Sequence, residues 1–175
     1  MDKLPFILPD RDLNLNLALV LLIIKHLGLS PRGIPLLNNE RISVFFYFVK
    51  NPTILERTLS RYGRGHVVLN YYEATSVNSI AVNLDSLFDR KWIKTLVKHL
   101  IARKFIEPVY RQKDGFLFQL SESGSAVTDS LSSEYFLRIS YFLSELTPLK
   151  SESTSAIHKM LNQTFREEVP NAHQA

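Results

Sequence analysis

The chain of 175 residues contains no cysteine. Disulfide bonds, thiolate nucleophiles and cysteine-ligated zinc sites are therefore excluded together, and the absence suits a reducing cytosol. Histidine is scarce as well, and its members are far apart in sequence: His26, His66, His99, His158 and His173. None of them has a second histidine or a carboxylate at the spacing of helical metal ligands, so the sequence predicts no metal site.

Long hydrophobic runs are also missing. The longest, Leu17 to Ile24, has eight residues, whereas a bilayer span needs about 20. The opening MDKLPFILPDRD interrupts its apolar residues with prolines and charges, which is unlike a signal peptide. We therefore expect a soluble cytoplasmic protein with no membrane partner.

Signatures of catalysis are absent from the sequence. There is no Gly-x-Ser-x-Gly elbow, and Glu122 and Asp129 fall where a helix opens, a place that carboxylates occupy for dipole reasons. No nucleophile, base or metal set converges in sequence. We therefore expect a protein that is not an enzyme and has no cofactor and no small-molecule ligand.

One glycine-rich turn, Gly63-Arg64-Gly65, has Arg57, Arg61 and His66 beside it. A phosphate-binding loop is one interpretation of this turn. However, no Gly-Lys-Ser/Thr follows it and no helix opens directly after it. The end of a helix, where positive charge is favoured, explains the arginines more simply.

The residues that are present suffice for a folded core, since 45% are hydrophobic and 11% aromatic. The pattern predicts a mainly α protein with a small β-hairpin wing, of the winged-helix type with additional N- and C-terminal helices. The expected domain covers 1–148, and a C-terminal helix with a mobile tail covers 149–175. Within the domain we expect three parts: a helical part over 13–84, a helix plus wing over 85–122, and a long helix over 125–146.

Local signals place the expected elements. Asn14 can cap an opening helix that is apolar on nearly all sides and ends at Gly28. Asn51 can cap a third helix, with Pro52 at its first position. Ser121 or Ser123 can cap the long helix. The stretch RGHVVLNYYEATSVNS is left open between strand and irregular loop.

Aromatic side chains are concentrated in two segments, Phe45 to Phe48 and the later helix that carries Tyr135 and Tyr141. Four consecutive aromatics on a helix point in every direction. At least one of Tyr47 and Phe48 should then lie outside the core or against another helix. We take Tyr47, Phe48, Tyr135 and Tyr141 as candidate protein-interface residues.

The segment from Arg90 to Phe105, RKWIKTLVKHLIARKF, combines a helical apolar stripe with charges that are all positive. A hairpin follows it, with an Asp-Gly turn. The candidate contacts to DNA or to an acidic partner on this helix and hairpin are Arg90, Lys91, Lys94, Lys98, Arg103, Lys104, Arg111 and Lys113. Three interpretations stay open: a solvated basic face, contact with an acidic protein surface, and contact with DNA phosphates. Of the side chains that read base edges only Arg90 is suitably placed, which argues against sequence-specific recognition.

The order of these elements is that of a winged-helix unit: a basic amphipathic helix, two strands, and a Leu-Ser-Glu-Ser-Gly turn at 120–124 that opens another helix. Further motifs are NERI at 39–42, a helix ending FVKNP at 48–52, and one ending RYG at 61–63. Together these motifs resemble the small middle component of bacterial ABC three-component anti-phage systems, the group that includes the third subunit of Lamassu defence. The resemblance covers most of 13–146.

The resemblance implies a non-catalytic adaptor between an SMC-like, DNA-sensing ATPase and an effector such as a nuclease, in anti-phage or anti-plasmid defence. This adaptor role is similar to that of the winged-helix accessory subunits of chromosome-condensing complexes, in which the fold binds protein more than DNA. Non-specific contact with double-stranded DNA is compatible with this role. One rival is a stand-alone winged-helix transcription regulator that inserts residues 90–104 into a major groove and dimerises through the long helix. A small enzyme is the second rival.

Overall fold

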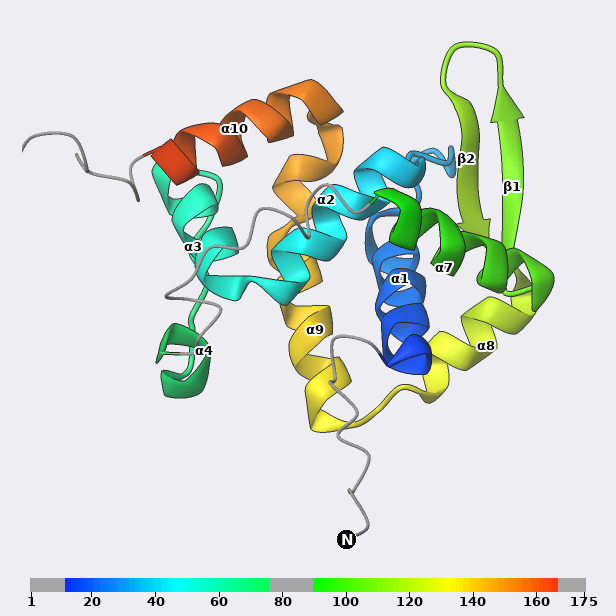
Figure 1. The fold of residues 1–175 in the computed structure, drawn as a ribbon, viewed down its shortest axis with the longest axis horizontal. Helices are drawn as coiled ribbons and strands as arrows, with labels where there is room; N and C mark the ends of the chain where they lie inside the picture. Colours follow the sequence, from blue (N-terminus) through cyan, green and yellow to red (C-terminus); the bar gives the residue numbers. More distant parts are fainter. Residues whose placement is uncertain (1–11, 76–89, 167–175) are drawn as a thin grey trace, which may run out of the picture.

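The computed structural model describes residues 12–75 and 90–166 of the chain (Figure 1). Its elements are α1 (Leu13–Leu27), α2 (Asn39–Lys50), α3 (Pro52–Arg61), α4 (Tyr71–Thr75), α7 (Arg90–Ala102), β1 (Ile106–Arg111), β2 (Gly115–Leu120), α8 (Glu122–Ser130), α9 (Glu134–Glu145), the 3-10 helix η2 (Thr147–Ser151) and α10 (Thr154–Arg166). The prediction of a mainly α fold with a small antiparallel hairpin is confirmed. The expected helix start at 85 and the tail 167–175 lie outside the described residues.

Helix α1 lies at the centre of the core, in contact with α2, α7, α8, α9 and β2. Every residue from Asn16 to Ile24 is buried, as its nearly uninterrupted apolar sequence predicts. The prediction that Asn14 caps this helix is wrong: Asp12 is the N-cap, and its carboxylate accepts a 3.0 Å bond from the Leu15 N–H. Gly28 ends the helix, as expected.

Helix α2 is buried along its whole aromatic run. Tyr47 is 2% exposed and Phe48 is fully buried, so the prediction that they are interface residues is wrong. The reason is that a second layer covers this helix. The ring of Phe165 on α10 lies edge-on to Tyr47, 6.0 Å between centroids, which is the packing against another helix that the sequence left open.

The C-terminal segment belongs to the same hydrophobic core as the rest of the described chain, through Ile157, Leu161 and Phe165. Helix α10 packs on α2 and α3, and Figure 1 shows it lying across them. Arg41 donates a 2.8 Å bond to the Lys150 carbonyl, which ties η2 to α2.

Two local predictions between α2 and α4 have clear outcomes. Asn51 precedes α3 as expected but does not cap it with its side chain, because its amide instead donates a 2.8 Å bond to the Tyr47 carbonyl. The stretch after Gly63 forms no strand over 64–70, and the short helix α4 follows it. Residues 76–79 of the ambiguous stretch lie outside the described residues.

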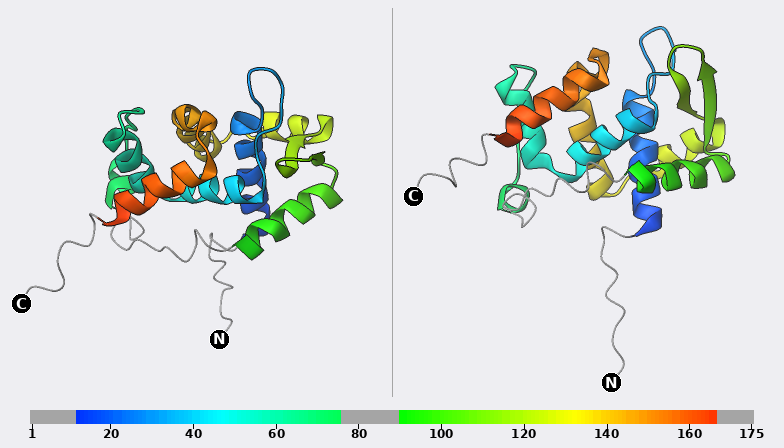
Figure 2. Two further views of the ribbon diagram at one scale, coloured as in Figure 1. Left: turned by 90° about the horizontal axis from the view of Figure 1, so that it is seen from above. Right: turned by 45° about the horizontal axis from the view of Figure 1, so that its top comes forward.

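The hairpin pairs Ile106 with Leu120 at one end and Arg111 with Gly115 at the other. Gly115 has φ +72°, so the Asp-Gly pair supplies the left-handed residue that the tight turn requires. The loop between α1 and α2 lies beside the hairpin (Figure 2). Leu37 in this loop forms a β-bridge with Phe118, which anchors the hairpin to the core.

The predicted long helix over 125–146 is two helices. Helix α8 ends at Ser130, Leu131 leaves the helical region at ψ 83°, and α9 begins after Ser133. The serines of the Ser-Leu-Ser-Ser segment favour this break, because their hydroxyls compete for backbone groups: Ser130 Oγ donates to the Val127 carbonyl at 2.7 Å.

The Leu-Ser-Glu-Ser-Gly turn holds the end of α7. Helix α7 ends in a Schellman motif, in which the Phe105 N–H bonds the Leu100 carbonyl and Lys104 has φ +57°. The hydroxyls of Ser121 and Ser123 both donate to the Lys104 carbonyl, at 2.6 and 2.7 Å. Ser121 also caps α8 by accepting from the Gly124 N–H.

Gly124 is needed at this joint because α8 touches the backbone of Phe105. A Cβ at position 124 would lie 1.9 Å from the Phe105 carbonyl oxygen. The glycine of the motif is therefore explained by a close backbone approach between the end of α7 and the start of α8.

We predict that Gly124→Ala lowers the free energy of unfolding by about 3 kcal/mol, because backbone must shift to admit the methyl group. In an unhindered helix the same change would stabilise, since alanine is the better helix former. Ser125→Ala, at the exposed neighbouring position, is the control and should change stability by less than about 0.5 kcal/mol. Urea unfolding measures both. Unchanged or raised stability of Gly124→Ala would refute the close approach.

Candidate functional site

A groove runs between α7 and one face of the hairpin, and we call it the α7–hairpin groove. Its volume is about 330 Å³. The residues that line it are Asn39, Lys94, Val97, Lys98, Ile101, Pro108, Phe116 and Phe118. Lys94 and Lys98 lie one helical turn apart, as do Val97 and Ile101, so two parallel rows of α7 side chains, one basic and one apolar, face the groove.

The hairpin contributes an apolar face to this groove. Tyr110 and Phe116 are paired across the strands, and their rings meet edge-on at 5.3 Å. Both are exposed, at 66% and 59%. Pro108 and Phe118 lie on the same face of the hairpin, because side chains alternate along each strand. An apolar surface therefore extends from the core to the outer part of the wing.

The eight candidate basic residues do not gather in one place. Lys94 and Lys98 line the α7–hairpin groove, whereas Arg111 and Lys113 line a separate hollow of about 390 Å³ together with Leu117. Leu117 and Arg111 belong to the opposite face of the hairpin from Phe116 and Phe118.

The other four basic residues have different surroundings. Arg90 pairs with Glu40 of α2 at 3.1 Å. Lys104 belongs to the turn that ends α7. Lys91 and Arg103 are exposed on α7 and after its end.

The basic residues were found from sequence, but the groove was not. Its apolar floor comes from alternate residues of the hairpin, and the alternation Phe116, Phe118 and Leu120 on one face was the available signal. What the sequence does not indicate is that α7 lies far enough from the outer hairpin to leave Phe116 uncovered.

A second group of exposed apolar side chains lies on the segment around α4 and on α9. It comprises Val68, Tyr71, Tyr72, Tyr135 and Leu137, and we call it the α4–α9 patch. Tyr135, one of the predicted interface residues, is 47% exposed. Tyr141, another, is partly buried: its hydroxyl accepts a 3.0 Å bond from the Val68 N–H.

An ion pair joins the two halves of the α4–α9 patch. Arg138 on α9 donates to both carboxylate oxygens of Glu73 on α4, at 2.7 and 2.5 Å, and to the Val68 carbonyl. Its guanidinium also lies 4.8 Å from the centroid of the Tyr141 ring. The hydrogen bonds from Arg138 lower the pKa of the Glu73 carboxyl below its ordinary value, although burial acts in the opposite sense.

The Gly63 turn is the end of a helix, as the simpler interpretation predicts. Helix α3 ends at Arg61, and Gly63 has φ +59°. Arg64 pairs with Glu152 at 2.5 Å, and His66 lies 3.3 Å from Glu56. The Arg64–Glu152 pair ties the end of α3 to the segment just before α10, whereas the His66–Glu56 contact holds the chain after Gly65 against α3 itself.

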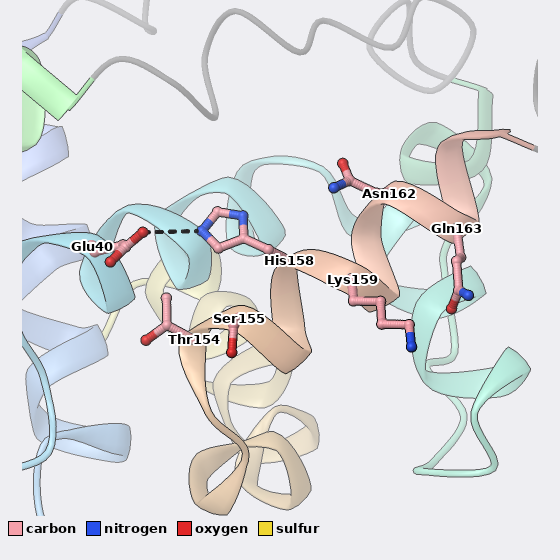
Figure 3. Close-up of a pocket in the computed structure, with 7 residues that line it drawn as sticks. All are labelled: Glu40, Thr154, Ser155, His158, Lys159, Asn162 and Gln163. Atoms are coloured by element: carbon pink, nitrogen blue, oxygen red, sulfur yellow. Dashed lines mark ion pairs between the residues drawn. The ribbon is translucent and has the colours of Figure 1, made fainter.

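A polar hollow of about 800 Å³ lies along α10 (Figure 3). His158 Nε2 is 3.6 Å from Glu40 Oε1 across it. Ser155 completes a set of residue types found in hydrolases, but its hydroxyl lies 3.0 Å from Ser153 Oγ and points away from the imidazole in Figure 3. The three side chains therefore do not form a relay.

Within residues 12–75 and 90–166, no group of three or more histidine, aspartate or glutamate side chains is placed to hold a metal ion. None of the helices in this described part is both long and apolar enough to cross a membrane.

Comparison with models of known protein families shows which family the chain belongs to. Residues 27–159, about three quarters of its length, match the model of Middle Component 4 of the ABC-three component (ABC-3C) system. The chain belongs to this family. Searches of curated proteins and of solved structures found no match. The resemblance to a middle component is thus confirmed at the level of the ABC-3C system.

As a middle component of a multi-component system, the protein acts together with protein partners. The match begins at the end of α1 and includes α7, both strands, α8 and α9, and it ends within α10 at Lys159. The residues of the α7–hairpin groove and of the α4–α9 patch therefore all come from the part of the chain that matches the family.

We predict that Glu73→Gln destabilises the protein by about 1–2 kcal/mol at pH 7, by removing the charge that Arg138 binds. Because the folded pKa of Glu73 is lowered, its contribution is complete above the unfolded pKa and is lost as the pH falls through the folded pKa. The difference from the wild type should therefore shrink in acid. Thermal unfolding as a function of pH measures it.

Glu107→Gln, on the exposed hairpin surface, is the control. Its stability should differ little from that of the wild type, both at pH 7 and in acid. A Glu73→Gln difference that stays constant down to strongly acid pH would show that the ion pair does not account for it.

Proposed function

We propose that this middle component is a non-catalytic adaptor that links an SMC-like, DNA-sensing ATPase to an effector, such as a nuclease, in anti-phage or anti-plasmid defence. The observation that carries the proposal is the presence of two separate exposed apolar surfaces, the outer hairpin and the α4–α9 patch. Figure 1 draws the hairpin and α4 at opposite ends of the molecule. An adaptor requires two such surfaces, because each partner needs its own apolar contact area.

The order α7, β1, β2, α8 supports a winged-helix unit within this adaptor, with the hairpin as the wing. The serine and glycine contacts of the Leu-Ser-Glu-Ser-Gly turn fix α7, the hairpin and α8 relative to one another. Such rigidity suits a subunit that holds partners in a defined geometry. A relationship to Lamassu-type systems is part of the same proposal.

A weak contact with double-stranded DNA is compatible with the adaptor, since Lys91, Lys94 and Lys98 are exposed on α7. The rival function, a dimeric transcription regulator, has less support. It needs a long helix for dimerisation, but residues 125–146 form two helices with a break at Leu131. Its predicted sequence-specific contact would also rest on Arg90, whose guanidinium pairs with Glu40.

The test is affinity purification of the tagged full chain co-expressed with the ATPase and effector components of its own system, with nuclease treatment of the lysate. We expect both components to be recovered after the treatment. The double variant Tyr135→Ser/Leu137→Ser should lose one of them and keep the other, because only the α4–α9 patch is altered. Leu29→Ser, an exposed apolar residue outside both surfaces, should keep both.

Recovery of neither component, or of a homodimer bound to one DNA sequence, would refute the adaptor. Loss of both partners in the Tyr135→Ser/Leu137→Ser variant would show that the two surfaces are not independent.

A further inference from the structure

We propose that the α7–hairpin groove binds an acidic amphipathic segment of a partner protein. The segment would insert apolar side chains between α7 and the hairpin and pair its carboxylates with Lys94 and Lys98. The inference deepens the proposed function, because it names the chemistry of one partner contact, and it rests on that function for the partner's place in the system.

The floor of the groove requires an apolar ligand. Val97 and Ile101 of α7 face Pro108, Phe116 and Phe118 of the hairpin. The Phe116 ring remains 59% exposed, although it touches Tyr110. Covering this floor with apolar side chains would remove its apolar surface from water, which favours binding. A groove of about 330 Å³ admits a few side chains of one segment, at the lower end of the usual size of binding pockets.

The rim of the groove requires negative charge. Lys94 and Lys98 are both exposed, and no carboxylate is among the described residues that line the groove. Their backbone positions are separated by one helical turn, about 6 Å. Carboxylates one turn apart on a helix, or two residues apart on a strand, have a similar spacing and would meet both amines.

A polar group at the groove also lacks a partner. Asn39, at the start of α2, contributes to the lining, and its side-chain oxygen is shielded from solvent without a hydrogen bond to the described residues. An N–H group of a bound segment would reach this acceptor once the Asn39 side chain turns toward the groove. The apolar floor and the basic rim together match a polypeptide with acidic and apolar residues.

Duplex DNA fits the groove less well than a peptide does. Phosphate groups would pair with the lysines but would leave the apolar floor without a complementary surface. Arg111 and Lys113, which a DNA surface formed by helix and wing would use, line the hollow on the other face of the hairpin. The structure therefore favours the peptide.

The test uses the full chain alone, immobilised and presented with a phage-displayed library of random peptides. We expect enrichment of peptides that combine Phe, Leu or Ile with two Asp or Glu residues at the spacing given above. The affinity of a selected peptide, measured by fluorescence anisotropy, should fall about tenfold or more for Phe116→Ser and for Lys94→Glu/Lys98→Glu.

The matched control is Lys91→Glu/Arg103→Glu, which makes the same change of charge on and just after the same helix but outside the groove. Its peptide affinity should change less than threefold at 150 mM salt, because screening weakens charges that do not touch the ligand. Lys94→Gln/Lys98→Gln, a milder change, guards against loss of folding, which circular dichroism monitors for every variant.

Four results would overturn the proposal. One is the absence of enriched acidic–apolar peptides. A second is an equal loss of peptide affinity in Lys94→Glu/Lys98→Glu and in Lys91→Glu/Arg103→Glu. A third is an unchanged peptide affinity in Phe116→Ser. Either of these two results would indicate general charge attraction. The last is displacement of the peptide by a labelled 20-base-pair duplex whose own binding needs Lys94 and Lys98 but not Phe116. Because the selection uses this chain alone, its failure leaves the co-purification test of the adaptor unaffected.

Discussion

The burial of α1 on all sides is the constraint on which the rest of the structure depends. A helix that is apolar around its whole circumference must be covered around its whole circumference, and α2, α7, α8, α9 and β2 together provide this cover. The hairpin is part of the cover: its inner residues Ile106 and Phe118 are buried, while its outer residues Tyr110 and Phe116 extend beyond the core. The hairpin thus has an inner part that helps to cover the core and an outer part that stays exposed.

The second determinant is the joint between α7 and α8. The Schellman turn at Lys104, the serine hydroxyls that bond its carbonyl, and the contact of Gly124 with Phe105 fix the direction in which the hairpin leaves α7. The α7–hairpin groove is the space left between these two rigidly joined elements. Its position on a rigid scaffold means that a partner would bind without first ordering the site, which reduces the entropic cost of association.

Sequence periodicity predicted the elements whose signals are local. The all-apolar α1, the Asp-Gly hairpin and the amphipathic α7 and α10 follow from spacing and turn chemistry alone. Two errors are local, because Asp12 and not Asn14 caps α1, and the Asn51 side chain bonds the Tyr47 carbonyl instead of capping α3. The errors that bear on the candidate site have other causes. Tyr47 and Phe48 looked like surplus aromatics because nothing in the sequence indicates that α10 covers α2, and 125–146 looked continuous because no proline or glycine marks the break at Leu131. The basic residues of the candidate site could be predicted from the sequence. That Lys94 and Lys98 lie on one side of the hairpin and Arg111 and Lys113 on the other could not, because it depends on the register of the strands.

The central claim is that this middle component binds a protein partner through the α7–hairpin groove. Hydrogen–deuterium exchange of the full chain, alone and in complex with the other components of its ABC-3C system, tests it most directly. The account predicts slower exchange on complex formation at the last turns of α7 and along the outer hairpin, over residues 97–102 and 108–118. Protection confined to other segments, with unchanged exchange at α7 and the hairpin, would contradict it.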